Sequence, residues 1–152
     1  MKKYLIIVEK NYIKKRFKEI FESIKSELSF DIDIAVANNH ILNLDSHIIY
    51  DLKDIEHTEV VIGDRKYPKN YRLICNGPYE DFGNIITKLV NENHYDAIVN
   101  ACDVDDCGNM IFNYVIYSLG LGSYETKRMD YVDITDKTII DLFKEFDHEN
   151  QN

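Results

Sequence analysis

The first thirty residues combine a continuous apolar run with a helical stripe. Residues 4–8 are uniformly apolar and end at Glu9, which is typical of a strand buried on both faces in a parallel sheet. Apolar side chains then recur at helical spacing between residues 13 and 28, with lysines on the other faces. This spacing predicts an amphipathic helix, and a strand followed by a helix is half of a βαβ unit.

Similar patterns continue along the chain. Residues 31–37 alternate and predict a second strand, whereas residues 43–71 are polar and irregular and predict a long loop with a short strand at 59–62. The remaining expected elements are, in chain order, a helix over 82–90, a central strand over 96–102, a helix over 111–119, a last strand over 131–134 and a final helix over 139–146 capped by Thr135.

Alternating strands and helices predict an α/β fold with a mostly parallel central sheet of about four strands and helices on both faces. The 152 residues fit one domain, expected to span 1–146, with 147–152 as a frayed tail. No apolar run approaches the roughly 20 residues of a membrane span, and the apolar run after Met1 is too short for a signal peptide. We therefore expect a cytoplasmic protein without a membrane partner.

Carboxylates follow two of the most strand-like segments. Glu9 comes directly after the first, and Asp103 and Asp105 come after the central one. Ligands of open parallel sheets bind beyond the carboxyl ends of the strands, and side chains two apart on an extended segment point the same way. Mg²⁺ prefers a few hard oxygen ligands and retained water. The sequence predicts a Mg²⁺ site at this edge, with Mn²⁺ as the alternative ion.

Two other interpretations of these acids stay open. Acidic residues at strand ends are common in solvated turns. A receiver-like domain also clusters carboxylates at the ends of parallel strands. That arrangement requires an acidic pair after the first strand, whereas in this chain Glu9 is followed by Lys10 and Asn11. The net charge of −9 argues against strong nucleic-acid binding by the chain alone, because affinity for phosphates comes from Lys and Arg.

The motifs resemble those of Toprim domains, most of all those of type IA DNA topoisomerases of the topoisomerase III kind. Glu9-Lys10 is similar to the Glu-Lys start of that family, and residues 39–42 resemble its Gly-His-Leu segment. Residues 103–109 match its Asp-Pro-Asp-Arg-Glu-Gly-Glu box, and residues 125–135 resemble its Lys-Arg…Glu-Ile-Thr stretch. The resemblance covers most of the chain and implies a Toprim domain.

The resemblance also implies residue roles. Asp103 and Asp105 would hold Mg²⁺, and Glu9 would be a metal neighbour or a general acid/base in breaking and rejoining a phosphodiester bond. Lys10 would stabilise negative charge on the phosphate. His40 would line the nucleic-acid groove, unless it is an ordinary loop histidine, and Arg128 would contact phosphate, unless it only pairs with Asp130.

The chain departs from the family pattern at three positions of the box. Cys107 replaces its third acid, Asn109 replaces another acid, and Asp106 reverses the charge of the usual Arg. None of the eleven tyrosines lies in a recognisable cleavage motif. A topoisomerase-like isomerase would therefore need a protein partner that supplies the nucleophilic tyrosine, and would act on nucleic acid, with DNA preferred. The alternatives are a small metal-dependent nuclease and a degenerate, non-catalytic module that binds nucleotide or protein.

Overall fold

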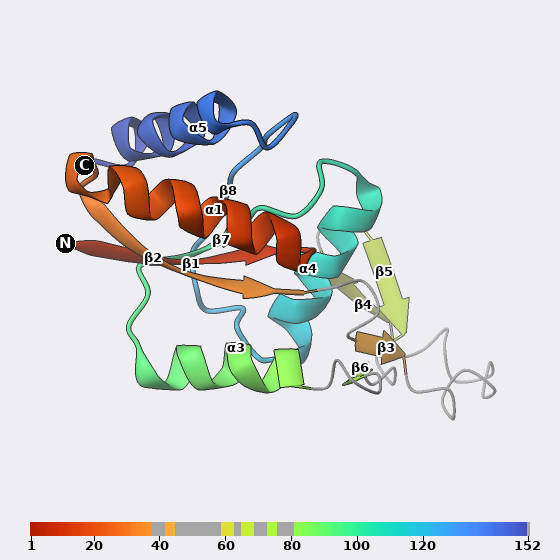
Figure 1. The fold of residues 1–152 in the computed structure, drawn as a ribbon. Helices are drawn as coiled ribbons and strands as arrows, with labels where there is room; N and C mark the ends of the chain where they lie inside the picture. Colours follow the sequence, from red (N-terminus) through yellow and green to blue (C-terminus); the bar gives the residue numbers. More distant parts are fainter. Residues whose placement is uncertain (38–41, 45–58, 63–64, 69–72, 76–80, 152) are drawn as a thin grey trace.

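The chain folds around a four-stranded, all-parallel sheet, which confirms the predicted α/β, Rossmann-like class (Figure 1). The computed structural model describes residues 1–37, 42–44, 59–62, 65–68, 73–75 and 81–151, with only the backbone described between 42 and 75 and at 81, 82, 106 and 107. The sheet has the order β2-β1-β7-β8, formed by β1 (Lys2–Val8), β2 (Phe30–Val36), β7 (Ala97–Asn100) and β8 (Thr126–Arg128).

Helices cover both faces of this sheet (Figure 1). On one face lie α1 (Asn11–Ile24), which continues into the short 3-10 helix η1 (Lys25–Glu27), and α5 (Asp136–Glu149); the other face carries α3 (Asp81–Glu92) and α4 (Asp106–Ser118). Within the described ranges, no helix combines the length and apolar character that crossing a bilayer requires.

The continuous apolar run of β1 contributes side chains to two separate hydrophobic cores, because successive side chains of a strand point to opposite faces of the sheet. Tyr4 and Ile6 pack with the aromatic residues of α1 and α5, where Phe17 and Phe143 meet edge to face with ring centroids 5.6 Å apart. Leu5 and Ile7 belong to the core beneath α3 and α4. Burial on both faces is the reason why this strand shows no polar alternation.

Four short strands lie within or directly beside residues 43–71, which were expected to be a long loop. β3 (Leu42–Leu44) pairs antiparallel with β6 (Leu73–Cys75), and β4 (Glu59–Ile62) pairs antiparallel with β5 (Arg65–Pro68). The short strand expected at 59–62 is confirmed, and the other three were missed. Strands of three or four residues carry too little periodicity to stand out from an irregular polar segment.

The last strand of the central sheet was predicted in the wrong place. Residues 131–134 form no strand; β8 (Thr126–Arg128) fills that position and pairs with β7 from Ile98↔Thr126 to Asn100↔Arg128. The apolar character that suggested a strand comes from the packing of Tyr131 and Ile134 on the core beneath α1 and α5. The true strand is polar, so the hydrophobic pattern did not reveal it.

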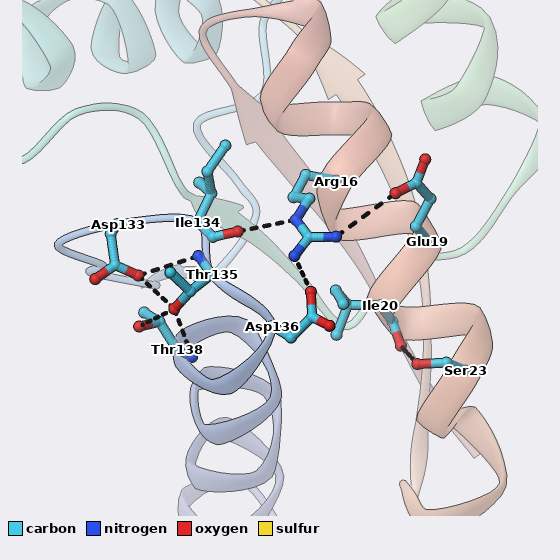
Figure 2. A network of polar contacts seen from close by, with 9 residues as sticks. All are labelled: Arg16, Glu19, Ile20, Ser23, Asp133, Ile134, Thr135, Asp136 and Thr138. Atoms are coloured by element: carbon cyan, nitrogen blue, oxygen red, sulfur yellow. Dashed lines mark hydrogen bonds and ion pairs between the residues drawn. The ribbon is translucent and has the colours of Figure 1, made fainter.

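A polar network fixes the segment before α5 to α1 (Figure 2). Arg16 donates from Nε to the carbonyl oxygen of Ile134 at 2.9 Å and also pairs with Asp136. The side chain of Thr135 accepts a hydrogen bond from the backbone N–H of Thr138, which confirms the predicted cap.

Helix α5 runs three residues beyond the predicted boundary at 146. Asp147, which was expected to begin the frayed tail, is only 7% exposed and accepts a hydrogen bond from the backbone N–H of Ser29 at 3.1 Å. The ordered structure therefore includes residues that the sequence pattern assigned to a tail, since the pattern could not reveal the distant donor.

Candidate metal and phosphate site at the carboxyl edge of the sheet

Glu9 and Asp103 meet at the carboxyl edge of the central sheet. The strands β1 and β7 are neighbours with Ile7 opposite Asn100, so the residues that follow each strand emerge side by side. The residue Glu9 is 6% exposed, and its Oε1 accepts a hydrogen bond from the backbone N–H of Asp103 at 2.9 Å. Segments 94 positions apart in the chain therefore place a buried carboxylate against the loop that carries Asp103 and Asp105.

The loop from Asp103 to Gly108 is tightly constrained. The Asp105 side chain caps α4, because its Oδ1 accepts a hydrogen bond from the Gly108 N–H at 2.6 Å. A Cβ on Gly108 would lie 2.8 Å from the carbonyl carbon of Asp103, 2.9 Å from its nitrogen and closer still to its oxygen. Gly108 lies inside the first turn of α4, which begins at Asp106 and therefore earlier than the expected helix over 111–119, and it permits this close backbone approach.

The site is electrostatically negative. Burial raises the pKa of Glu9 above its ordinary value of 4.5, and the charges of Asp103 and Asp105 raise it further. The hydrogen bond from the Asp103 N–H and the charge of Lys10 act in the opposite direction. Burial also raises the pKa of the Cys102 thiol, as do the nearby charges of Glu9 and Asp103. A thiol held in its protonated form is a poor nucleophile.

Tyr131 lies beside the same site in a structural role. Its hydroxyl donates a hydrogen bond to the carbonyl oxygen of Ala101 at 2.8 Å. Burial, followed by the charge of Asp103, raises its pKa. Tyr131 is therefore held as a neutral hydrogen-bond donor rather than as an activated nucleophile.

The two cations predicted for the site occupy its borders. Lys10 precedes α1 at its N-cap position, and its Nζ lies 5.8 Å from the centroid of the Tyr12 ring. Arg128, at the end of β8, pairs with Asp130 at 3.0 Å and also donates to the side-chain oxygen of Asn109. The second expectation for Arg128, an ion pair with Asp130, is thus observed, together with a partner that the sequence did not suggest.

An amide network that the sequence did not reveal links β7 to α4. The buried Asn100 accepts a hydrogen bond from the backbone N–H of Cys102 at 3.0 Å through its Oδ1. Its amide nitrogen donates weakly to Asn109 Oδ1 at 3.4 Å, and the same oxygen binds Arg128. A polar residue at the end of an otherwise apolar strand was the available signal, because buried amides require partners.

The oxygen ligands of this site suit a hard cation, but the carboxylates are not already arranged in a complete coordination sphere. Glu9 Oε1 and Asp105 Oδ1 each already accept a backbone hydrogen bond, which leaves the second oxygen of each and the exposed Asp103 carboxylate. Among the described side chains, no three Asp, Glu, His or Cys residues already surround a common point. Asp103 and Asp105 are exposed, so the Asp103 carboxylate and the second oxygen of Asp105 are accessible to a Mg²⁺ or Mn²⁺ ion, and carboxylate oxygens are its preferred ligands.

The remaining predicted positions lie outside the described part. His40 falls in the undescribed residues 38–41, and the side chains of Asp106 and Cys107 are not described. Comparison with known proteins finds no matching protein-family model and no significant match among curated proteins. The resemblance to Toprim domains therefore stays an inference from the residues themselves.

Proposed function

We propose that this chain is a Toprim-type, Mg²⁺-dependent domain that acts in breaking and rejoining phosphodiester bonds, similar to the corresponding part of type IA topoisomerases. The observation that carries the proposal is the hydrogen bond between the buried Glu9 carboxylate and the Asp103 N–H. It brings an acid from the first strand against the acids that follow β7. Metal-dependent phosphoryl chemistry needs this kind of convergence.

In this proposal, each residue has a distinct role. Asp103 and Asp105 hold the ion, which would neutralise charge on the reacting phosphate. Glu9 exchanges a proton with the attacking or leaving oxygen; its raised pKa favours this role, because an acid/base catalyst works best when its pKa approaches the ambient pH. Lys10 stabilises negative charge on the phosphate.

The nucleophile would come from a partner. Tyr131, a tyrosine whose hydroxyl lies beside the site, is committed to the Ala101 carbonyl oxygen. We therefore propose that a second protein supplies the cleavage tyrosine and also the basic surface that a chain of net charge −9 lacks for gripping DNA.

Calorimetric titration with Mg²⁺ tests the metal site directly. We expect binding by the natural chain and its loss in the Asp103→Asn, Asp105→Asn double variant. Asp141→Asn is the matched control, because it removes one exposed carboxylate of α5, paired with Lys137 at 3.3 Å, far from the loop in sequence. No Mg²⁺ binding by the natural chain would overturn the proposal and favour a non-catalytic module.

The raised pKa of Glu9 also supports a second function, that of a stand-alone nuclease. A protonated Glu9 could donate to the leaving oxygen while water replaces the tyrosine as nucleophile. Incubation with single-stranded DNA and RNA in Mg²⁺ or Mn²⁺ separates the two functions. Cleavage without a partner that is lost in the Asp103→Asn, Asp105→Asn variant supports the nuclease, whereas cleavage that survives in this variant contradicts the mechanism.

A further inference from the structure

The outer edge of β2 is a free edge of the central sheet. In the order β2-β1-β7-β8, β2 pairs with β1 on one side and with no described strand on the other. Backbone groups of successive residues in a strand alternate between its two edges. Ala37, directly after β2, donates its N–H toward β1, to the carbonyl oxygen of Val8 at 2.7 Å, so Ile32 and Ile34 direct their backbone groups outward. Unpaired groups of this kind are a template for pairing with another chain.

Only part of this edge is satisfied within the fold. The Ile32 N–H donates to Oδ1 of Asp31 at 2.8 Å. The next outward N–H, that of Ile34, has no such acceptor among the described residues. An added strand would therefore find its open backbone donor at Ile34.

A groove lies along this edge, and Figure 1 shows the two helices, α1 and α3, that flank β2. The groove has a volume of about 330 Å³, and its lining includes Ile32 and Ile34 of β2 together with Ile85 and Leu89 of α3. Ile85 is 43% exposed, which leaves apolar surface open to a ligand. An unpaired strand edge beside side-chain pockets is the arrangement by which proteins bind an extended peptide as an added strand.

The acids of the groove are paired within the fold, whereas its lysines are not. Asp33 pairs with Lys3 at 3.2 Å, and Glu22 pairs with Lys25 at 2.7 Å. The two lysines that α1 contributes to the groove, at positions 14 and 18, make no ion pair with any described residue. In a chain of net charge −9, this local positive charge favours an acidic occupant. A nucleic-acid strand would meet the lysines but would leave the open backbone edge and the apolar wall unused.

We propose that this groove binds an extended, acidic segment of a partner protein, which adds a strand to the sheet outside β2. Successive side chains of the added strand would point to opposite faces of the sheet. One set would bring carboxylates to Lys14 and Lys18 on α1, and the other would bring apolar groups to Ile85 and Leu89 on α3. The inference goes beyond the proposed function and is independent of it, because it concerns the outer edge of β2 and needs no metal.

A synthetic peptide of alternating valine and glutamate, blocked at both ends and as long as the 7 residues of β2, serves as the probe. Titration of the full chain in EDTA, followed by its backbone amide NMR signals, should shift the signals of Ile32, Ile34 and Ile85. Amide hydrogen exchange at Ile34 should slow when the peptide is bound, because its N–H then gains an acceptor. A peptide of alternating valine and lysine should bind more weakly, although the net charge of −9 favours it everywhere outside the groove.

Substitutions on α1 test the charge of the groove. Lys18→Ala should weaken binding of the glutamate peptide about threefold, and the Lys14→Ala, Lys18→Ala double variant about tenfold. Lys15→Ala is the matched control, because it removes an exposed lysine of the same helix that does not line the groove. It should change the affinity by less than about twofold.

Methylated peptides separate strand addition from simple charge attraction. Only alternate backbone N–H groups of an added strand face β2, so glutamate peptides methylated at every valine nitrogen or at every glutamate nitrogen should differ about tenfold in affinity. Equal affinity of these two peptides, or tighter binding of the lysine peptide, would overturn the inference.

Two further results would assign the groove to another occupant and would also overturn the inference. One is a dimer in sedimentation velocity that the Lys14→Ala, Lys18→Ala variant abolishes, which would indicate a second copy of the chain. The other is binding of single-stranded DNA, weakened in the same variant, without binding of the glutamate peptide. Because the titration is carried out in EDTA, peptide binding by a chain that fails the Mg²⁺ titration would refute the metal-dependent function and leave the peptide groove standing.

Discussion

The two ends of the central sheet treat their carboxylates in opposite ways. Toward the amino ends of β1 and β7, Lys3 and Tyr95 hold the carboxylate of Asp33, a residue in the middle of β2: it accepts a hydrogen bond from the Tyr95 hydroxyl at 2.6 Å and pairs with Lys3 at 3.2 Å. At the carboxyl edge, the described side chains provide no ion pair for Glu9, Asp103 or Asp105, and burial together with the charges of Asp103 and Asp105 raises the pKa of Glu9. One end is neutralised within the fold, and the other is left negative.

This difference suggests that the amino end of the sheet is built for stability, whereas the carboxyl end is where a function is expected. A fold that satisfies its acids at one end could do so at the other, and sites that break local rules are the ones expected to be functional. At the carboxyl edge, one carboxylate oxygen of Glu9 and one of Asp105 accept a backbone hydrogen bond. The second oxygen of each stays open. An added cation would therefore stabilise this end and leave the amino end unchanged.

The largest expected effect comes from Gly108→Ala, which tests how rigidly the carboxyl edge is built. The added Cβ would overlap the backbone of Asp103, so the loop must shift. We expect the free energy of unfolding, measured with urea, to fall by about 3 kcal/mol. Gly122→Ala is the matched control: it has open space around its Cβ and should change stability by less than about 0.5 kcal/mol. Equal stability of the two variants would contradict the tight loop.

Tyr95→Phe tests the neutralised end and should have a smaller effect. Loss of the hydroxyl removes one hydrogen bond to Asp33 and leaves the ion pair with Lys3, so we expect about 1 kcal/mol of destabilisation in urea unfolding. Tyr117→Phe, on the exposed side of α4, serves as control. If the comparison of the two ends holds, Mg²⁺ should stabilise Tyr95→Phe and the natural chain by the same amount.

Much of the central fold could be predicted because burial leaves a strong trace in the sequence. The uniformly apolar β1 and the helical stripes of α1 and α5 were expected at nearly their observed positions. The polar strand β8 was missed because it pairs through its backbone with Asn100 and its neighbours. An edge strand with exposed polar side chains carries no hydrophobic pattern, whereas Tyr131 carried one without being a strand.

The site was predictable where it depends on topology and hidden where it depends on long-range side-chain partners. The neighbouring ends of parallel strands were enough to bring Glu9 toward Asp103. No local pattern indicates that Asn109 binds Arg128, because that contact joins residues 19 positions apart on different elements. The close approach of Gly108 to Asp103 is likewise a property of the folded loop.

A substitution of Glu9, at the carboxyl edge, tests the same comparison and should have the smallest effect. Glu9→Gln keeps the oxygen that accepts from the Asp103 N–H and removes the charge. The pKa of Glu9 is raised in the folded chain, so its charge costs stability at neutral pH. This cost vanishes as the pH falls below 4.5, where the carboxyl is protonated in both the folded and the unfolded state.

Without metal, the variant should therefore be slightly more stable than the natural chain at pH 7.5 and equally stable at pH 4. The gain should be small, because the hydrogen bond from the Asp103 N–H and the charge of Lys10 offset part of the burial and repulsion that raise the pKa. With saturating Mg²⁺ the order should reverse, since the natural chain then gains an attraction that the amide lacks. Urea unfolding at both pH values, with and without Mg²⁺, measures all of these differences. A variant less stable than the natural chain in EDTA at pH 7.5 would show that the Glu9 charge is already compensated and that the two ends of the sheet do not differ.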